Sequence, residues 1–477
     1  MAVITIKHYL PLDFDTYTVV QELLHSTYVS GGGTAALLQT SGGGGAFIVR
    51  GTGFQFDASG YLVAGIVSEI EFYRGGEIVI TASGLALDMA EAEAAYWNGV
   101  SYPLDPNPTF NYDASAVPPD DGWGIYFDSG SGNDTIVGTQ GHDDLAGFEG
   151  HDSILGLGGE DYIWGGLGND TVRGGEDSDE IFGGSDSDEL YGDGGDDLIM
   201  GGSGWDLIDG GDGMDIADFR DAAGKIVVTL NGAQDAAVFV AGGFADTIRN
   251  IEGVYGGDFA DKLTGDALKN SFMGGGGKDT IDGGRGTDMA LYFDKTSKVE
   301  VKLNGSTQVS VKVGGKVEDK IKNIEHVVGG AAGDKLTGDS KGNLLVGLGG
   351  KDQLTGGAGN DTLHGGEGRD VLEGGSGRDT FWFDDPVLYA NRDTIKDFGG
   401  KDEIVLDSWY FGALGPTVTS NEFRKGTAAR DADDFLIYNK ANGKLYYDAD
   451  GNGAGAQVEI AVLSNKPNLS ASDFEIV

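Results

Sequence analysis

Aspartates recur every nine residues through the middle of this chain, at a spacing that could bind metal ions. Between Gly130 and Phe219 a nonapeptide repeats ten times without an insertion. Three columns hardly vary: a glycine, an aspartate two residues later and an aliphatic residue two after that. Carboxylate and backbone carbonyl oxygens are the ligands that Ca²⁺ prefers, and it takes roughly six to eight of them. The candidate calcium ligands of this block are Asp134, Asp143, Asp152, Asp161, Asp170, Asp179, Asp188, Asp197, Asp206 and Asp215.

The other columns of the repeat predict the elements that hold these aspartates. Glycine permits the positive-φ conformations with which a short turn reverses direction. The segment after each aspartate is a strand too short to be stable alone, so its aliphatic side chain must stack on other copies. Two nonapeptides form one coil, which places an ion between copies n and n+2. The expected inward column is Ile136, Leu145, Ile154, Ile163, Val172, Ile181, Leu190, Ile199 and Ile208.

Ten nonapeptides in phase resemble the repeats of the RTX (repeats-in-toxin, haemolysin-type) family, whose members form calcium-binding parallel β-rolls. The resemblance runs from the first repeat to the last residue. It implies a secreted protein whose C-terminus is recognised by a type I exporter, and whose rolls fold in the calcium outside the cell. The C-terminal residues Asp473–Val477, an acidic residue before apolar ones, fit that resemblance.

The repeat resumes twice after two related insertions. IRNIEGVYGG and IKNIEHVVGG align at an offset of 73 residues, which indicates a duplication. The further candidate ligands are Asp261, Asp279, Asp288, Asp334, Asp352, Asp361, Asp370 and Asp379. Asn270 and Asn343 replace the aspartate in two copies, and we expect those sites to be weak or empty. With one ion per pair of copies, we expect roughly 10–14 calcium ions.

Some copies also lack the glycine that precedes the aspartate. Phe259, Leu268, Ala332 and Lys341 replace it after the insertions. Asp177 and Asp186 replace it in the first block, where aspartate tolerates the left-handed conformation better than most residues.

The expected fold is all-β dominated, a parallel β-roll in three blocks with a small N-terminal α+β module and a C-terminal β-rich cap. In the module we predict strands at Ala46–Arg50, Tyr61–Ile66, Ser68–Tyr73 and Glu77–Ala82, and a helix at Leu85–Trp97. The expected segments are the N-terminal module (1–105), a linker (106–129), the first roll (130–219), an inserted β-hairpin (220–256), the second block (257–292), a second hairpin (293–329), the third roll (330–383) and the C-terminal cap with the secretion signal (384–477).

The charge of the chain argues against one class of partner and predicts a role for a cation. Its 77 acidic and 32 basic residues give a formal charge of −45, which argues against nucleic acid as a partner. Without a divalent cation the acidic repeats should repel one another, so folding and calcium binding are expected to be coupled. The N-terminus has no pattern of a cleaved secretory signal, and no apolar run is long enough to span a bilayer.

A second calcium motif stands near the C-terminus. Asp448, Asp450 and Asn452, with Glu459 at the twelfth position, match the pattern of an EF-hand loop. The flanking segments have the pattern of strands, so the alternative is a tight hairpin that uses Asp and Gly for its turn.

The even-numbered copies of the first block carry an apolar outer surface: Tyr162, Trp164, Phe182, Leu198, Met200 and Ile216. Either another part of the chain covers this surface, or it binds a second copy or a cell-surface partner.

No catalytic motif is recognisable. The chain lacks H-E-x-x-H and G-x-S-x-G, so we predict no catalytic residue and no enzyme activity. The expected function is that of an extracellular or cell-surface calcium-binding protein with a structural, surface-layer, matrix or adhesive role. The alternative is an enzyme or small-ligand binder acting through residues 1–105, for example a haem carrier that uses His25 and Tyr28.

Overall fold

The computed structural model describes the backbone of nine strands between residues 5 and 128, and all residues from Gly132 to Val477 except the side chain of Phe244. These residues form β-strands and two short 3-10 helices, and no α-helix occurs among them. The all-β fold with parallel sheets is confirmed. In the described part of the chain, neither helix could cross a membrane. The chain divides into two units, Met1–Ala222 with Leu230–Gly253, and Ala223–Thr229 with Val254–Val477.

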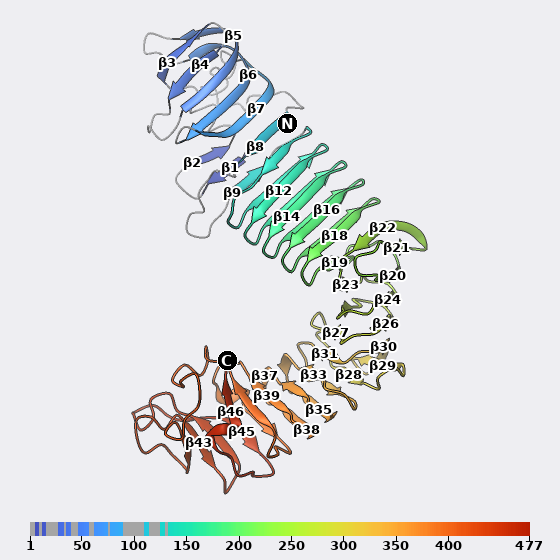
Figure 1. Ribbon diagram of the computed structural model, residues 1–477, viewed down its shortest axis with the longest axis vertical. Coiled ribbons are helices and arrows are strands. Elements are labelled where there is room, and N and C mark those ends of the chain that lie inside the picture. The colour runs from blue at the N-terminus through green and yellow to red at the C-terminus, as the bar shows by residue number, and fades with distance from the viewer. Residues whose placement is uncertain are drawn as a thin grey trace. The chain divides into compact units, whose positions relative to one another are not determined.

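The first block is a parallel roll in which strands of alternate copies pair (Figure 1). One sheet contains the strands of odd copies and the other those of even copies. Val172, for example, lies opposite Ile154 on one side and Leu190 on the other. The nine residues of the predicted inward column are buried, with at most 2% exposed, which confirms their placement. The strands are β10 (Thr135–Val137), β11 (Asp144–Glu149), β12 (Ser153–Gly158), β13 (Tyr162–Leu167), β14 (Thr171–Glu176), β15 (Glu180–Ser185), β16 (Glu189–Gly194), β17 (Leu198–Ser203), β18 (Leu207–Asp212) and β19 (Ile216–Asp218).

Nine strands precede the roll. They are β1 (Thr5–His8), β2 (Leu12–Asp15), β3 (Thr27–Gly32), β4 (Ala35–Gln39), β5 (Ala46–Phe56), β6 (Leu62–Arg74), β7 (Glu77–Asp88), β8 (Thr109–Asp113) and β9 (Ile125–Asp128). Strands β3 to β8 pair antiparallel in chain order. The predicted strands of this module are confirmed, although the two expected between residues 61 and 73 are one strand, β6.

The prediction of a helix at Leu85–Trp97 is wrong for its first four residues. Leu85–Asp88 belong to β7, where Leu87 lies opposite Val67 of β6. Pairing with a neighbouring strand overrides the intrinsic helix propensity of these residues. Residues 89–97 lie outside the described part of the chain.

The segment predicted as a linker, residues 106–129, contains β8 and β9. Strand β8 pairs in parallel with β10, and β9 pairs in parallel with β11. Each sheet of the roll therefore begins on a strand that precedes the repeats, and the first repeat strand of neither sheet is left as an open edge.

Each insertion contains an antiparallel strand pair that also extends the parallel sheet. In the first, β20 (Ile226–Thr229) is followed by β21 (Ala236–Val240) and β22 (Gly243–Arg249). Strand β22 pairs with β21 and, in parallel, with β18. In the second, β28 (Val299–Lys302) is followed by β29 (Val309–Val313) and β30 (Lys316–Lys322), and β30 pairs with β29 and, in parallel, with β26.

The remaining repeats form short parallel strands. The first insertion ends with β23 (Gly253–Tyr255), and the strands of the second block are β24 (Lys262–Thr264), β25 (Ser271–Met273), β26 (Thr280–Asp282) and β27 (Met289–Leu291). The second insertion ends with β31 (His326–Val328). The strands of the third block are β32 (Lys335–Thr337), β33 (Leu344–Val346), β34 (Gly349–Gly350), β35 (Gln353–Ala358), β36 (Thr362–His364), β37 (Glu367–Gly368), β38 (Val371–Ser376) and β39 (Thr380–Phe383).

The C-terminal segment continues both sheets of the third block. Strand β40 pairs in parallel with β38, and β41 with β39. The last strand, β46, completes the second sheet by pairing with β41. The elements are η1 (Tyr389–Asn391), β40 (Asp393–Ile395), β41 (Glu403–Leu406), β42 (Phe423–Lys425), β43 (Leu436–Asn439), β44 (Lys444–Tyr447), β45 (Val458–Leu463), η2 (Ala471–Asp473) and β46 (Phe474–Ile476).

Candidate calcium sites

The structure arranges the predicted aspartates as a ladder of backbone-to-carboxylate hydrogen bonds. All eighteen are buried, with at most 3% exposed. The backbone N–H of Asp152 donates to Asp170 Oδ1 at 2.8 Å, and that of Asp170 donates to Asp188 Oδ1 at 2.8 Å. The same bond, eighteen residues apart, recurs along both sheets. This bond fixes the orientation of each carboxylate through Oδ1. The second oxygen, Oδ2, takes no part in the ladder.

In most copies that second oxygen is buried without a hydrogen-bond donor. A buried acceptor without a partner costs roughly 1–3 kcal/mol, and more when it is charged. We call the turn before such an aspartate an open turn. The repeat aspartates with an unpartnered Oδ2 are Asp152, Asp161, Asp170, Asp179, Asp188, Asp197, Asp206, Asp215, Asp279, Asp288, Asp352, Asp361 and Asp370.

The ninth residue of the repeat lies beside this oxygen. A Cβ placed on Gly165 would lie 2.7 Å from Asp170 Oδ2 and 2.7 Å from the carbonyl oxygen of Gly183. No side chain fits there, which explains why the ninth position is a glycine in nearly every copy. The carboxylate and carbonyl oxygens that meet at this point are both hard donors, and such donors suit Ca²⁺.

The raised pKa values of the buried aspartates also indicate a place for a cation. Burial, with added repulsion from neighbouring aspartates, raises the pKa of Asp161 to about 9 and that of Asp188 to about 8. The same causes raise the pKa of Asp152 to about 7. A divalent ion beside Oδ2 would offset both the lost hydration and the repulsion. The residues of the open turns therefore fit calcium, which would neutralise carboxylates that burial otherwise disfavours.

Three repeat aspartates have this oxygen satisfied within their own turn. The N–H of Thr139 donates to Asp143 Oδ2 at 2.6 Å, that of Gly257 to Asp261 Oδ2 at 3.0 Å, and that of Gly330 to Asp334 Oδ2 at 2.6 Å. We call these turns closed. An oxygen that already accepts a short N–H bond is a weaker ligand.

The two asparagine copies are closed in the same way. Asn270 Oδ1 accepts from the N–H of Asp266 at 2.9 Å, and Asn343 Oδ1 from the N–H of Asp339 at 2.8 Å. Asn343 also donates from Nδ2 to the carbonyl of Glu325 at 2.8 Å. Local hydrogen bonds here take the place that a cation takes in the open turns.

Backbone conformation separates the two kinds of turn. In the open turn before Asp179, Gly175 and Asp177 have φ of 128° and 74°. No closed turn has a positive φ at its first or third residue. Four of the closed turns have Phe259, Leu268, Ala332 or Lys341 as the third residue, and side chains disfavour the left-handed conformation. The fifth begins with Thr139, which is β-branched.

Sequence reasoning missed six acidic residues that extend the ladder beyond the nonapeptides. In the insertions and the C-terminal segment, aspartates and glutamates accept the same backbone N–H bond. They are Asp246 from Asp206, Glu252 from Asp215, Asp319 from Asp279, Glu325 from Asp288, Asp393 from Asp370 and Asp402 from Asp379. The signal was present, because each of the four aspartates stands two residues before a buried isoleucine.

In the predicted EF-hand loop, the acidic residue at the twelfth position has cationic partners from other parts of the chain. Glu459 lies in β45, where its Oε1 pairs with Arg392 at 2.6 Å and its Oε2 with Lys444 at 2.7 Å. Two cations therefore already neutralise this carboxylate. Asp450 Oδ2 accepts from the N–H of Gly455 at 2.9 Å, and Asn452 Nδ2 donates to the carbonyl of Arg430. Asp448 and its neighbours thus build a hairpin turn, which was the alternative interpretation.

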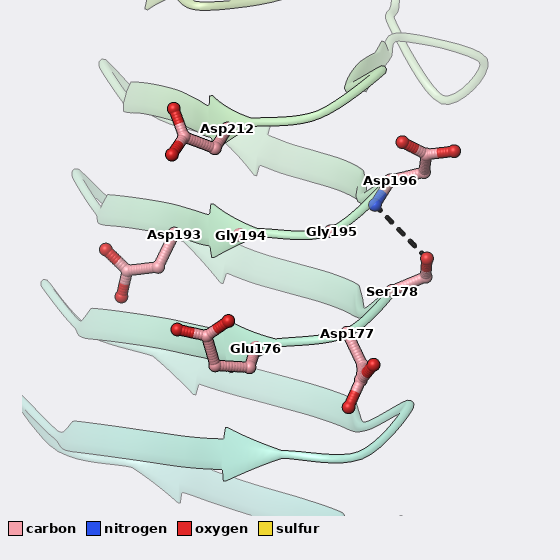
Figure 2. A pocket seen from close by; sticks show the side chains of 8 residues that line it. All are labelled: Glu176, Asp177, Ser178, Asp193, Gly194, Gly195, Asp196 and Asp212. Carbon is pink, nitrogen blue, oxygen red and sulfur yellow. Dashed lines mark hydrogen bonds between the residues drawn. The ribbon is translucent and has the colours of Figure 1, made fainter.

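An acidic pocket lies on the outer side of the even turns of the first block. Figure 2 shows the carboxylates of Glu176, Asp193 and Asp212 on successive turns, with Asp177 and Asp196 at the other end. The remaining lining residues are Ser178, Gly194 and Gly195. This surface concentrates negative potential outside the ladder, where it attracts cations from solution.

The apolar surface of the even copies is partly exposed. Tyr162 is 45% exposed and Trp164 is 40% exposed, while Phe182, Leu198, Met200 and Ile216 are half-buried. The rings of Tyr162 and Phe182 lie 5.0 Å apart. Tyr162 and Trp164 therefore remain accessible to a partner.

The repeats match one protein-family model, described as the RTX calcium-binding nonapeptide repeat. The matches cover residues 128–163, 146–181, 155–190, 182–217, 255–290, 328–363 and 346–381. No curated protein matches the chain.

Two solved structures are similar to parts of the chain. The extracellular lipase LipA from Serratia marcescens is 19% identical over 67% of this chain and 45% of its own, with a TM-score of 0.23. The AlgE6R3 subunit of the Azotobacter vinelandii mannuronan C5-epimerase is 30% identical over 30% of this chain and 77% of its own, with a TM-score of 0.21. The matched region thus spans less than half of the lipase, and we infer no activity from either protein.

The ladder, the open turns and the family matches agree with one another. This chain carries RTX calcium-binding nonapeptide repeats, and these repeats bind calcium ions.

Proposed function

We propose that the chain leaves the cell unfolded through a type I exporter and folds outside when calcium fills the open turns. The folded rolls then serve a structural or adhesive role, in a surface layer, an extracellular matrix or a cell-contact assembly. One observation carries the calcium-dependent folding, namely the thirteen buried repeat carboxylate oxygens that lack a hydrogen-bond donor.

Each unpartnered oxygen destabilises the metal-free roll, and the formal charge of −45 adds repulsion over the whole chain. An ion that binds the folded roll and not the unfolded chain stabilises the fold in proportion to the logarithm of its concentration. The roll is therefore expected to be unfolded at low calcium and folded at the millimolar calcium found outside cells.

Circular dichroism of the full-length protein, with excess chelator and with calcium, tests this folding step. We expect the β-sheet signal of the rolls to depend on calcium and to be reversed by chelation. A fully folded protein in chelator, with no metal found by elemental analysis, would contradict the proposal.

The assembly role is supported by the exposed aromatic residues Tyr162 and Trp164 on the even copies. We expect full-length protein in calcium to form dimers or larger particles in light scattering, and Tyr162→Ser with Trp164→Ser to reduce their size. Thr171→Ala, on the other sheet, is the matched control. A strictly monomeric particle would favour the alternative, an enzyme or ligand binder acting through residues 1–105. The residues considered for it, His25 and Tyr28, lie outside the described side chains.

A further inference from the structure

A histidine and two aspartates meet where the third roll ends. His364 is the last residue of β36, and Asp384 and Asp385 directly follow β39. One ligand atom from each of these three side chains lies within 4.8 Å of the other two. None of the three residues is a repeat aspartate. The group therefore lies outside the calcium ladder and combines a nitrogen ligand with two carboxylates.

The parallel pairing of β36 with β39 brings these side chains together. His364 lies opposite Trp382, and Leu363 lies opposite Phe381. Leu363 and Phe381 are fully buried inside the roll, so the residues next to them point to its outer face. Asp384, two residues after Trp382, continues on that face. The ion pair between His364 Nε2 and Asp384 Oδ1 agrees with this placement.

The ion pair leaves the second aspartate without a partner. In the part of the chain that the structure describes, the carboxylate of Asp385 takes part in no hydrogen bond or ion pair. Burial, with added repulsion from Asp384 and against the charge of His364, raises the pKa of Asp385 to about 6. One imidazolium cannot neutralise two carboxylates, whereas one divalent ion can.

The group is open to solution but has no second cationic side chain. The side chains of His364 and Asp384 are 21% and 31% exposed, so an ion can reach them. The arginines nearest in sequence have other partners: Arg369 lies over the ring of Tyr389, Arg378 pairs with Glu403 at 2.8 Å, and Arg392 pairs with Glu459 at 2.6 Å.

The ligand set selects a different metal from that of the open turns. Ca²⁺ takes oxygen ligands, whereas an imidazole nitrogen suits Zn²⁺ and other divalent transition metals. Bonds of about 2.0–2.2 Å place the ligand atoms of a tetrahedral zinc site about 3.3–3.5 Å apart. Rotation of half-buried side chains on the outer face brings the three ligand atoms to that spacing without moving a strand.

We propose that His364, Asp384 and Asp385 bind one divalent transition-metal ion with the chemistry of Zn²⁺. The ligands are Nε2 of the histidine and one oxygen of each carboxylate, and a water molecule completes the set. This ion joins β36 to the segment that leads from the third roll into the C-terminal cap. It is separate from the calcium ions of the ladder in both its ligands and its metal.

Isothermal titration calorimetry of the full-length protein with zinc chloride, in millimolar calcium, tests the site. Calcium in excess fills the open turns, so we expect one tight zinc site per chain. His364→Gln keeps an amide that can hydrogen-bond to Asp384, yet it should weaken zinc binding by about 100-fold or more. Asp385→Asn should do the same, because even a residue that only orients a metal ligand is typically worth about 10- to 100-fold in affinity.

The matched control is His326→Asn, in the same sheet of the roll. His326 Nδ1 accepts the N–H of Leu344 at 2.9 Å, and the amide oxygen of asparagine can accept the same bond. This variant should bind zinc as the wild type does.

Two results would overturn the inference. One is a wild-type protein that is folded in calcium and binds no zinc, which would indicate that His364 and Asp384 form only an ion pair. The other is equal zinc affinity in the wild type and in a folded His364→Gln or Asp385→Asn variant. The inference does not depend on the proposed function, because a protein that stays folded in chelator contradicts that function but is titrated with zinc in the same way once the chelator is removed.

Discussion

The turns of the first block and the turns that follow each insertion satisfy the same side-chain oxygen in different ways. In the first block, eight of ten repeat aspartates keep a buried oxygen without a donor. After each insertion, the first two turns close on themselves through a backbone N–H, at Asp261 and Asn270 and again at Asp334 and Asn343. The ladder therefore requires a partner for this oxygen, and the turn residues decide whether it is an N–H or a metal ion.

Chelation of calcium should give the largest difference between strands that follow open turns and strands that follow closed turns. In excess chelator, hydrogen exchange of the amides in β12 to β18 should accelerate by about 100-fold or more, because the open turns lose their cations. Amides of β24, β25, β32 and β33, which follow closed turns, should accelerate less. Mass spectrometry of the full-length protein measures both. Equal acceleration in the two groups would show that the kind of turn does not set local stability.

The pH dependence of the metal-free protein should have the opposite sign to that of most acidic proteins. Burial raises the pKa of Asp161 from 3.8 to about 9 and that of Asp188 to about 8. The folded roll then holds protons that the unfolded chain has released, so this stability is full below the ordinary value and is lost as pH rises through about 8 to 9.

Circular dichroism in chelator measures this effect. We expect more β-structure at about pH 5 than at about pH 9, and a smaller difference in saturating calcium, where the ion replaces the protons. Metal-free protein that gains structure as pH rises would contradict the raised pKa values.

Gly165→Ala should destabilise the calcium-bound roll by about 2 kcal/mol, because its Cβ would crowd both Asp170 Oδ2 and the carbonyl of Gly183. Gly194→Ala is the matched control in the same block. The nearest atoms to a Cβ there lie 3.8 Å away, and no positive φ is required. Urea denaturation in calcium compares the two. A similar loss in both variants would mean that the ninth-position glycine has no special role.

The smallest effect should come from a pair of aspartate substitutions. Asp161→Asn removes a charged ligand from an open turn and should raise the calcium concentration needed for folding by about tenfold, near 1.4 kcal/mol. Asp143→Asn, in a closed turn, should change it by less than about twofold, because Asn270 and Asn343 already accept the equivalent N–H. Calcium titrations followed by circular dichroism measure both. A larger shift for Asp143→Asn would reverse the assignment of open and closed turns.

Much of the roll could be predicted because its information is local and periodic. The inward column and the aspartate column follow from residues two positions apart, repeated every nine residues. Calcium binding is expected to be weak at the copies with Asn270 and Asn343. In the structure both of these turns are closed by a backbone N–H.

What could not be predicted depends on pairing between distant segments. Leu87 has the propensity of a helix residue but lies opposite Val67 in a sheet. Asp246 and Asp319 join the ladder only because a strand returns to it across about 40 residues, a separation that no nonapeptide pattern contains. Glu459 fits a calcium loop by spacing, yet two cations from other strands hold it.

The hydrogen bonds of the ladder link each aspartate to the one eighteen residues away, from Asp134 to Asp152 and from Asp143 to Asp161. Copies that are adjacent in sequence therefore belong to two separate series of hydrogen bonds, one along each sheet. Removing one nonapeptide would transfer every later strand to the opposite face, whereas removing two would leave all faces unchanged. The length of such a roll can therefore change only in steps of eighteen residues, which is one full coil, if every later strand is to stay in its own sheet.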